Sequence, residues 1–311
     1  MPDHAGRTRG ALAILVFSLM PDLLSTESRG VSPWAARLAG RYEVLPDTPY
    51  RENPSLNLDL YLPRHRARPV PCAIFFHGGG WAAGTKESEV LWVAPYLELG
   101  WAVANVEYRL AGVSPAPAAV EDGRCALRWV SRHAREHGMD ADRIVVTGLS
   151  AGGHLALMTG MLPVSAGFDE QCLGEGPERE PVPKIAAIVN WFGVTDVADL
   201  LGGRDVRRYA MDWVGSLPNR GARAQAVSPL HYVRAGLPPV LTIHGDADDI
   251  VPYSQALRLH QALDQAGVPN QLLTIAGGRH GLLGEQAVRG PAAIRAFLRE
   301  HGLLEPARAA R

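Results

Sequence analysis

The chain has 311 residues, of which 47% are hydrophobic and 20% are charged, and its formal net charge at pH 7 is −1. This length and composition suffice for one large α/β domain or two small ones with a sizeable core, and they argue against a disordered chain. No run of lysine or arginine stands out, so we expect neither nucleic acid nor an anionic membrane surface as a partner.

The N-terminal segment permits two interpretations. Arg7 and Arg9 precede an apolar run at residues 11–20, which has the length of a signal-peptide core and is too short to span a bilayer. Residues 20–30 contain no good small-x-small cleavage site. The protein would be secreted if residues 7–30 act as a signal peptide. Otherwise a cytoplasmic location is favoured. We expect residues 1–40 to form an N-terminal extension, either signal-like or a packed helix, without a stable membrane anchor.

Residues 41–311 are expected to form a single domain that starts with a hairpin. Residues 42–45 and 56–62 predict two strands, the second with clear alternation of apolar and polar positions. After a proline-rich turn, residues 72–76 are continuously apolar, which is typical of a strand buried on both faces of a parallel sheet.

This buried strand ends in the loop His77-Gly78-Gly79-Gly80-Trp81. Three glycines at the end of a strand cost backbone entropy and contribute nothing to a core, but they free backbone N–H groups to approach a ligand. His77 and Trp81 would anchor and shape such a loop. We therefore interpret the loop as functional rather than as a flexible turn.

The next elements are an amphipathic helix at 89–99, a strand at 101–106 and a long helix at about 118–137. On the long helix, Arg128, Arg132, Arg135 and Glu136 are expected to face solvent. Asp122 near its start is expected to pair with Arg109 and to hold loops in place. The three cysteines show no metal-ligand spacing, and an odd number gives no complete disulfide framework, so we interpret Cys72, Cys125 and Cys172 as core or incidental thiols.

An apolar run at 144–147 then breaks at the pattern Gly148-x-Ser150-x-Gly152 and continues into a helical pattern at 151–161. A strand that turns sharply into a helix exposes the central serine on a strained backbone, and a Cβ at either glycine would collide with the neighbouring strand or helix. Ser150 would sit at a helix N-terminus, where N–H groups favour developing negative charge. The pattern predicts a nucleophile elbow.

The remaining elements alternate between strands and helices. Strands are predicted at 185–190, 239–244 and 271–275, and helices at 253–266 and 287–301, which together indicate a mostly parallel sheet covered on both faces. Lid-like insertions are expected near 163–184 and 192–236. Functional loops gather at the carboxyl ends of parallel strands, so the glycine loop, Ser150, an acidic loop at 244–252 and a histidine loop at 277–281 should share one crevice.

These motifs resemble the α/β-hydrolase superfamily, and within it small esterases with a His-Gly-Gly-Gly-Trp loop, closest to the BD-FAE-type esterases that deacetylate carbohydrates or release feruloyl groups. The resemblance covers about residues 56–301 and includes Tyr108-Arg109-Leu110, the elbow up to His154, and His244-Gly245-x-x-Asp248. It implies an α/β-hydrolase fold with a doubly wound, mostly parallel sheet and a small lid.

The resemblance implies a serine-histidine-aspartate triad. His280 is expected to act as general base toward Ser150, and the family's His-Gly-x-x-Asp spacing selects Asp248 as the acid, with Asp246 and Asp249 as turn-forming or ion-pairing alternatives. His154 and His244 are interpreted as structural hydrogen-bonding residues. The backbone N–H groups of three residues would form the oxyanion hole: Gly79, Gly80 and Ala151.

The expected function is a serine esterase that acts on a small-molecule ester with a short acyl or an aryl group, without a metal or an organic cofactor. Trp81, Trp191 and Phe192 are expected to contact the substrate and to narrow its acyl side. An arylformamidase of the kynurenine formamidase type is the alternative, because it shares a His-Gly-Gly-x-Trp loop. A non-catalytic binding protein on a hydrolase scaffold is a third hypothesis.

Overall fold

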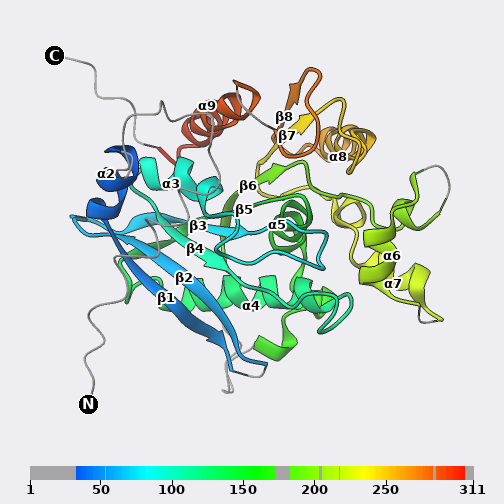
Figure 1. The fold of residues 1–311 in the computed structure, drawn as a ribbon, viewed down its shortest axis with the longest axis horizontal. Coiled ribbons are helices and arrows are strands. Elements are labelled where there is room, and N and C mark those ends of the chain that lie inside the picture. Colours follow the sequence, from blue (N-terminus) through cyan, green and yellow to red (C-terminus); the bar gives the residue numbers. More distant parts are fainter. Residues whose placement is uncertain are drawn as a thin grey trace, which may run out of the picture.

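An eight-stranded sheet organises the computed structural model, which describes residues 33–52, 54–172, 183–202, 205–216, 218–282 and 285–304 (Figure 1). Its strands are β1 (Tyr42–Arg51), β2 (Leu56–Pro63), β3 (Val70–Phe76), β4 (Ala102–Val106), β5 (Met139–Leu149), β6 (Ile185–Trp191), β7 (Val240–Gly245) and β8 (Asn270–Ile275). They lie in the order β1-β2-β4-β3-β5-β6-β7-β8. The N-terminal apolar run at 11–20 lies outside the described residues.

Eight α-helices accompany the sheet in the described part of the chain. They are α2 (Pro33–Arg41), α3 (Ala94–Glu98), α4 (Ala118–His133), α5 (Ala151–Met161), α6 (Arg208–Val214), α7 (Arg220–Ala226), α8 (Ser254–Gln265) and α9 (Glu285–Glu300). Short 3₁₀ turns add η1 (Val90–Val93), η2 (Val164–Ala166), η3 (Glu170–Cys172), η4 (Asp199–Leu201) and η6 (Pro229–Tyr232). In Figure 1, α6 and α7 stand beside the sheet, to the right of α5.

The strand directions confirm the expected fold class. β1 pairs with β2 and β2 with β4 in antiparallel fashion, and every later neighbour pairs in parallel. The predicted hairpin is therefore present, with a first strand that extends to Arg51. Parallel pairing brings the carboxyl ends of β3, β5, β7 and β8 to one edge, where the four candidate loops leave the sheet.

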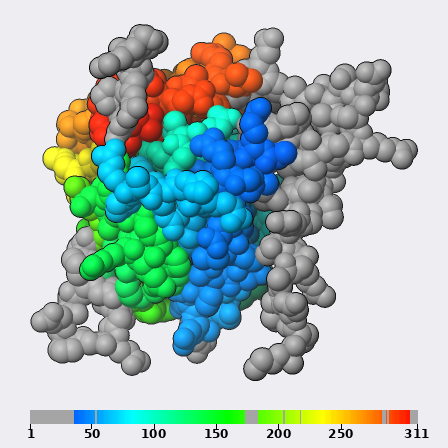
Figure 2. All heavy atoms as spheres, turned by 90° about the vertical axis from the view of Figure 1, so that its left-hand side faces the viewer, coloured from blue at the N-terminus to red at the C-terminus, as the bar shows by residue number. Residues whose placement is uncertain are grey.

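The sheet is covered on both faces because neighbouring residues of each central strand point in opposite directions. In β5, Val146 packs in the core that contains residues of α4 and α5, whereas Val145 packs in the core that contains residues of α3 and α9. Figure 2 shows the side of the molecule on which the blue strands β1 and β2 lie below the orange and red atoms of α9. The continuous apolar runs of β3 and β5 follow from burial on both sides.

The expected single helix at 89–99 is wrong in detail. The segment forms the 3₁₀ turn η1 followed by the short helix α3, with Pro95 in the first turn of α3. Proline has no N–H to donate and clashes with the preceding turn of a continuous helix, so the helix starts afresh at this point.

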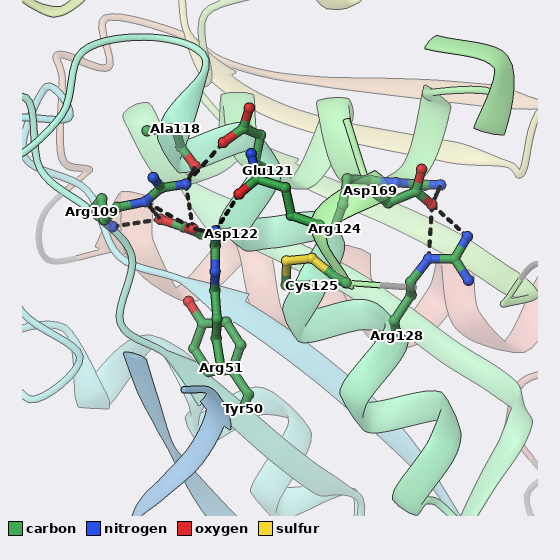
Figure 3. The surroundings of a disulfide bond; sticks show 12 residues. Tyr50, Arg51, Arg109, Ala118, Glu121, Asp122, Arg124, Cys125, Arg128 and Asp169 are labelled. Atoms are coloured by element: carbon green, nitrogen blue, oxygen red, sulfur yellow. Dashed lines mark hydrogen bonds and ion pairs between the residues drawn. A yellow bond between two sulfur atoms is a disulfide. The ribbon is translucent and has the colours of Figure 1, made fainter. Parts of the chain in front are cut away.

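The expectation that Arg128 faces solvent is also wrong. The side chains of Arg124 and Arg128 are buried and both bind Oδ2 of Asp169, at 2.9 Å and 2.6 Å. At the other end of α4, Arg109 pairs with the fully buried Asp122 as expected, and Arg51 joins the pair at 2.8 Å. Figure 3 shows these two ionic clusters on either side of Cys125. The partners lie far away in the sequence, so helical periodicity could not reveal them.

The interpretation of the cysteines needs a correction. Cys125 of α4 and Cys172 of η3 form a disulfide across a sequence separation of 47, and Cys72 is a buried free thiol in β3 (Figure 3). The disulfide and the Arg128–Asp169 ion pair both fasten the segment after α5 to α4. Among the described residues, no helix is long and apolar enough to cross a bilayer.

Candidate active site

Ser150 lies where β5 turns directly into α5. Its φ of 55° and ψ of −119° place a non-glycine residue in a strained region of backbone conformation. A Cβ on Gly148 would lie 2.5 Å from the carbonyl oxygen of Phe76, and one on Gly152 would lie 2.0 Å from that same oxygen. The two glycines therefore permit the close approach of β3 and α5 that a sharp elbow requires.

His280 lies on the loop after β8 and faces both Ser150 and Asp248. Its Nε2 is 3.0 Å from the Ser150 Oγ, and its Nδ1 is 2.8 Å from Oδ2 of Asp248. With the proton on Nδ1 donated to the carboxylate, Nε2 is left to accept the serine hydroxyl proton. The arrangement can thus raise the nucleophilicity of Ser150.

Asp248 is held by donors on both of its oxygens. The backbone N–H groups of Ile250 and Val251 donate to Oδ1, each at 2.9 Å, and His244 Nε2 lies 3.1 Å from Oδ2. Burial alone would raise the pKa of Asp248, but the hydrogen bonds from His244 and His280 outweigh it and hold the pKa well below its usual value. The carboxylate is therefore kept ionised beside the imidazole.

The competing aspartates have other partners. Asp246 accepts a hydrogen bond from the backbone N–H of Gly277 at 2.7 Å, and Asp249 forms an exposed ion pair with Arg279 at 2.7 Å. Of these three aspartates, only Asp248 has a hydrogen bond with His280 among the described contacts.

His154 and His244 occupy the structural positions expected for them. His154 is fully buried, donates from Nε2 to the carbonyl of Val227 at 2.7 Å, and accepts at Nδ1 from the indole N–H of Trp81. His244 is also buried, and its Nε2 lies 3.0 Å from the carbonyl oxygen of Val251. Neither imidazole has a hydrogen bond to Ser150 among the described contacts.

The glycine loop lies against the elbow. Gly79 and Gly80 have φ angles of 108° and 60°, and a Cβ on Gly79 would lie 2.0 Å from the carbonyl oxygen of Ala83. Within the described chain, no carbonyl or side chain accepts a hydrogen bond from the N–H of Gly79, Gly80 or Ala151. These N–H groups border the same cavity as Ser150 and are available to an anionic oxygen.

The buried side chain of Trp81 anchors this loop. Its indole is fully buried, stacks on Trp213 of α6 with ring centroids 4.1 Å apart, and donates to His154 at 3.2 Å. Some of its atoms still line the cavity, so a substrate contact by Trp81 stays a prediction. Tyr209, also of α6, packs on Gly80 and donates from its hydroxyl to the carbonyl of Ile250.

A cavity of about 1070 Å³ opens around Ser150. Trp191, the last residue of β6, and Phe192, which follows it, line this cavity, and Phe192 has a φ of 40° and a T-shaped contact with His280 at 4.8 Å. Trp191 packs on Gly290 of α9. Their role as substrate contacts also stays a prediction.

Two further residues of the cavity wall carry no signal in the sequence. Trp92 of η1 makes T-shaped contacts with Trp191 at 4.9 Å and Phe192 at 6.0 Å, and Glu89 lines the cavity beside it. Both lie in a segment whose expected helical periodicity gave no sign of a tertiary partner. In the part of the chain that the structure describes, no cluster of three or more histidine, cysteine or carboxylate residues could hold a metal ion.

Comparisons with known proteins identify the relatives of this chain. Residues 58–263 match the BD-FAE protein family. The chain is 28% identical over 306 residues to esterase LipC of Mycobacterium tuberculosis, covering 94% of this chain and 74% of LipC. It is 26% identical to a probable isoprenylcysteine alpha-carbonyl methylesterase of Arabidopsis thaliana, covering 74% of this chain and 49% of the relative, so it spans about half the length of that protein.

A solved structure shows the same architecture. The propionate-bound esterase Est2 of Thermogutta terrifontis superposes with a TM-score of 0.69 at 30% sequence identity, covering 86% of this chain and 97% of Est2. The likeness therefore extends over nearly all of that esterase.

Proposed function

We propose that this chain, which belongs to the BD-FAE family of α/β-hydrolase esterases, hydrolyses carboxylic esters through Ser150, His280 and Asp248. The observation that carries the proposal is the position of the His280 imidazole, which lies within hydrogen-bond distance of both other side chains at one cavity. This is the arrangement that activates a serine hydroxyl in hydrolases.

The proposed reaction has two halves. In the first, Ser150 Oγ attacks the ester carbonyl while His280 takes its proton, and the resulting oxyanion accepts hydrogen bonds from the N–H groups of Gly79, Gly80 and Ala151. The imidazolium then protonates the departing alcohol, which leaves an acyl-serine. In the second half, His280 takes a proton from water, the hydroxide attacks the acyl carbon, and the carboxylic acid departs as Ser150 regains its proton.

We further infer that the acyl group is short. Trp191 and Phe192 would form a tight wall next to the reacting carbon, and the rest of the cavity would receive the alcohol. Support comes from the propionate bound to Est2. We also propose that residues 41–311 act as one hydrolase domain in which residues 192–236 form a lid and 163–184 a second insertion, with residues 1–40 as an extension.

A panel of substrates tests the reaction and the acyl preference together. We expect p-nitrophenyl acetate and butyrate to be hydrolysed with a kcat/KM about 10-fold or more above that of the decanoate, since each misfit methylene costs roughly 1 to 3 kcal/mol of discrimination. An N-formyl anilide should remain nearly uncleaved. The formamidase hypothesis gains no support from the names of the relatives, and faster cleavage of the anilide than of the acetate would contradict the proposed esterase function.

The chain-length profile of Trp191→Ala separates a pocket wall from a packing residue. If Trp191 limits the acyl chain, the variant should shift its preference toward longer esters. A lower melting temperature with an unchanged profile would instead assign the indole to packing against Gly290.

A further inference from the structure

A carboxylate without a partner lies on the wall of the cavity that holds Ser150. Glu89 immediately precedes η1, and the backbone N–H of Trp92 donates to its carbonyl at 3.0 Å. Glu89 and Trp92, three positions apart at the start of η1, both line the cavity, so a carboxylate and an indole border the same space.

The Glu89 side chain is half-buried, and among the described residues no N–H or cationic group binds its carboxylate. Burial raises the pKa of the Glu89 carboxyl, and no neighbouring lysine or arginine opposes this effect. A partly desolvated carboxylate without a donor is less favourable than a paired one, so a ligand that supplies the donor would be stabilised at this position.

The other charges around the cavity are already compensated. Glu98 of α3 and Arg295 of α9, which both line the cavity, form an ion pair of 3.2 Å between partly exposed side chains. Asp248, behind His280, is held by His244 and His280. Among the described residues that line the cavity, Glu89 is therefore the acidic residue whose charge has no partner.

We propose that Glu89 and Trp92 form a subsite for a protonated amine on the ester substrate, so that the enzyme prefers ammonium-bearing esters to neutral esters of the same length. The inference rests on the proposed esterase function and adds a substrate class to it. The ammonium group donates charge-assisted hydrogen bonds to the Glu89 carboxylate, and the indole of Trp92 contacts the cation and its methylene chain. An ester that carries a carboxylate is disfavoured at the same position because the two anions repel each other.

The amine could belong to the alcohol or to the acyl part, and two substrate series distinguish these sources. The first series consists of acetates of linear amino alcohols, and the second of methyl esters of linear ω-amino acids, with increasing chain length. Each compound is compared with the hydrocarbon ester in which a methyl group replaces the terminal ammonium. Ordinary alkylammonium groups stay protonated at pH 7.

In one of the two series, we expect wild-type kcat/KM to favour the ammonium ester over its methyl-terminated counterpart by about 10-fold at the best chain length. Glu89→Gln keeps the shape of the side chain but removes its charge, and it should bring this ratio to near one while the neutral ester is still hydrolysed. Glu43→Gln removes an exposed carboxylate on β1, away from the cavity, and should keep the wild-type ratio.

The outcomes separate the two levels of the proposal. A ratio near one in the wild type for both series, or an unchanged ratio in Glu89→Gln, overturns the ammonium subsite while the hydrolysis of the neutral esters still supports the esterase function. A wild-type chain that hydrolyses none of the neutral esters, or a Ser150→Ala variant that hydrolyses them at the wild-type rate, contradicts the esterase function itself.

Discussion

The hydroxyl of Ser150 and the imidazole of His280 are 130 positions apart in the sequence and 3.0 Å apart in the structure. The acidic loop brings Asp248 to the far side of that imidazole, where two backbone N–H groups and His244 fix its orientation. Each of these three side chains is positioned by its own strand end, so their geometry depends on the sheet and not on local sequence.

The first prediction concerns the acid. Asp248→Asn should lower kcat by a factor that approaches about 10⁴, because an amide cannot fix the imidazole tautomer that accepts the serine proton. Asp246→Asn and Asp249→Asn, whose side chains bind Gly277 and Arg279, should cost far less. Steady-state kinetics of the three variants compare these losses in kcat. If Asp249→Asn caused the large loss instead, the assignment of Asp248 as the triad acid would be wrong.

A second prediction concerns pH and the buried histidine His154. Burial lowers the pKa of His154 to about 4, from an ordinary value of 6.5. Between these two values the unfolded chain binds a proton that the folded chain does not, so stability falls as the pH falls from 6.5 to 4. At about 1.4 kcal/mol per pKa unit, the loss is on the order of 3 kcal/mol once the pH reaches 4.

Denaturant unfolding at several pH values measures this dependence. The burial of His77 lowers its pKa to about 4 as well and adds to the same slope. His154→Gln, which cannot titrate, should show a smaller loss of unfolding free energy between pH 6.5 and 4 than the wild type. An equal slope in the two proteins would mean that His154 is already protonated in the folded state at these pH values.

At the scale of elements, periodicity predicted the strands and most of the longer helices, but it predicted neither the short helices α6 and α7 nor the partners that the elements acquire. The expected helix at 151–161 coincides with α5, and the buried runs at 72–76 and 144–147 lie in β3 and β5. Arg128 was expected to face solvent because a helical pattern reveals only which side chains are apolar. Its burial depends on Asp169, a tertiary partner 41 positions away. The disulfide between α4 and η3 was missed for the same reason.

The disulfide provides a prediction at this scale. Replacing both Cys125 and Cys172 by serine should lower the free energy of unfolding by about 2 to 4 kcal/mol, because the unfolded chain loses a cross-link that closes a long loop. Thermal or denaturant unfolding with and without a reductant measures the effect. Reductant should bring the wild type to the stability of the double variant and leave the variant unchanged, whereas a wild type that does not respond to reductant would contradict the stabilising role.

At the scale of the whole molecule, the order of the motifs along the chain was the most informative property of the sequence. A glycine loop, a Gly-x-Ser-x-Gly elbow, an acidic loop and a histidine loop follow four predicted strands, and parallel pairing brings those strand ends together. The cavity wall around Glu89 and Trp92 could not be predicted in this way. It arises where Trp92 of η1 packs against Trp191 of β6, and no local pattern specifies that contact.

The central claim is that Ser150 is the nucleophile of an esterase, and covalent labelling tests it most directly. A fluorophosphonate probe should modify the intact protein once, and peptide mapping should place the adduct on Ser150. Ser150→Ala should take up no probe and should lose at least about 10³-fold in kcat while keeping the wild-type melting temperature. An adduct on another residue, or a Ser150→Ala variant that retains both turnover and labelling, would contradict the claim.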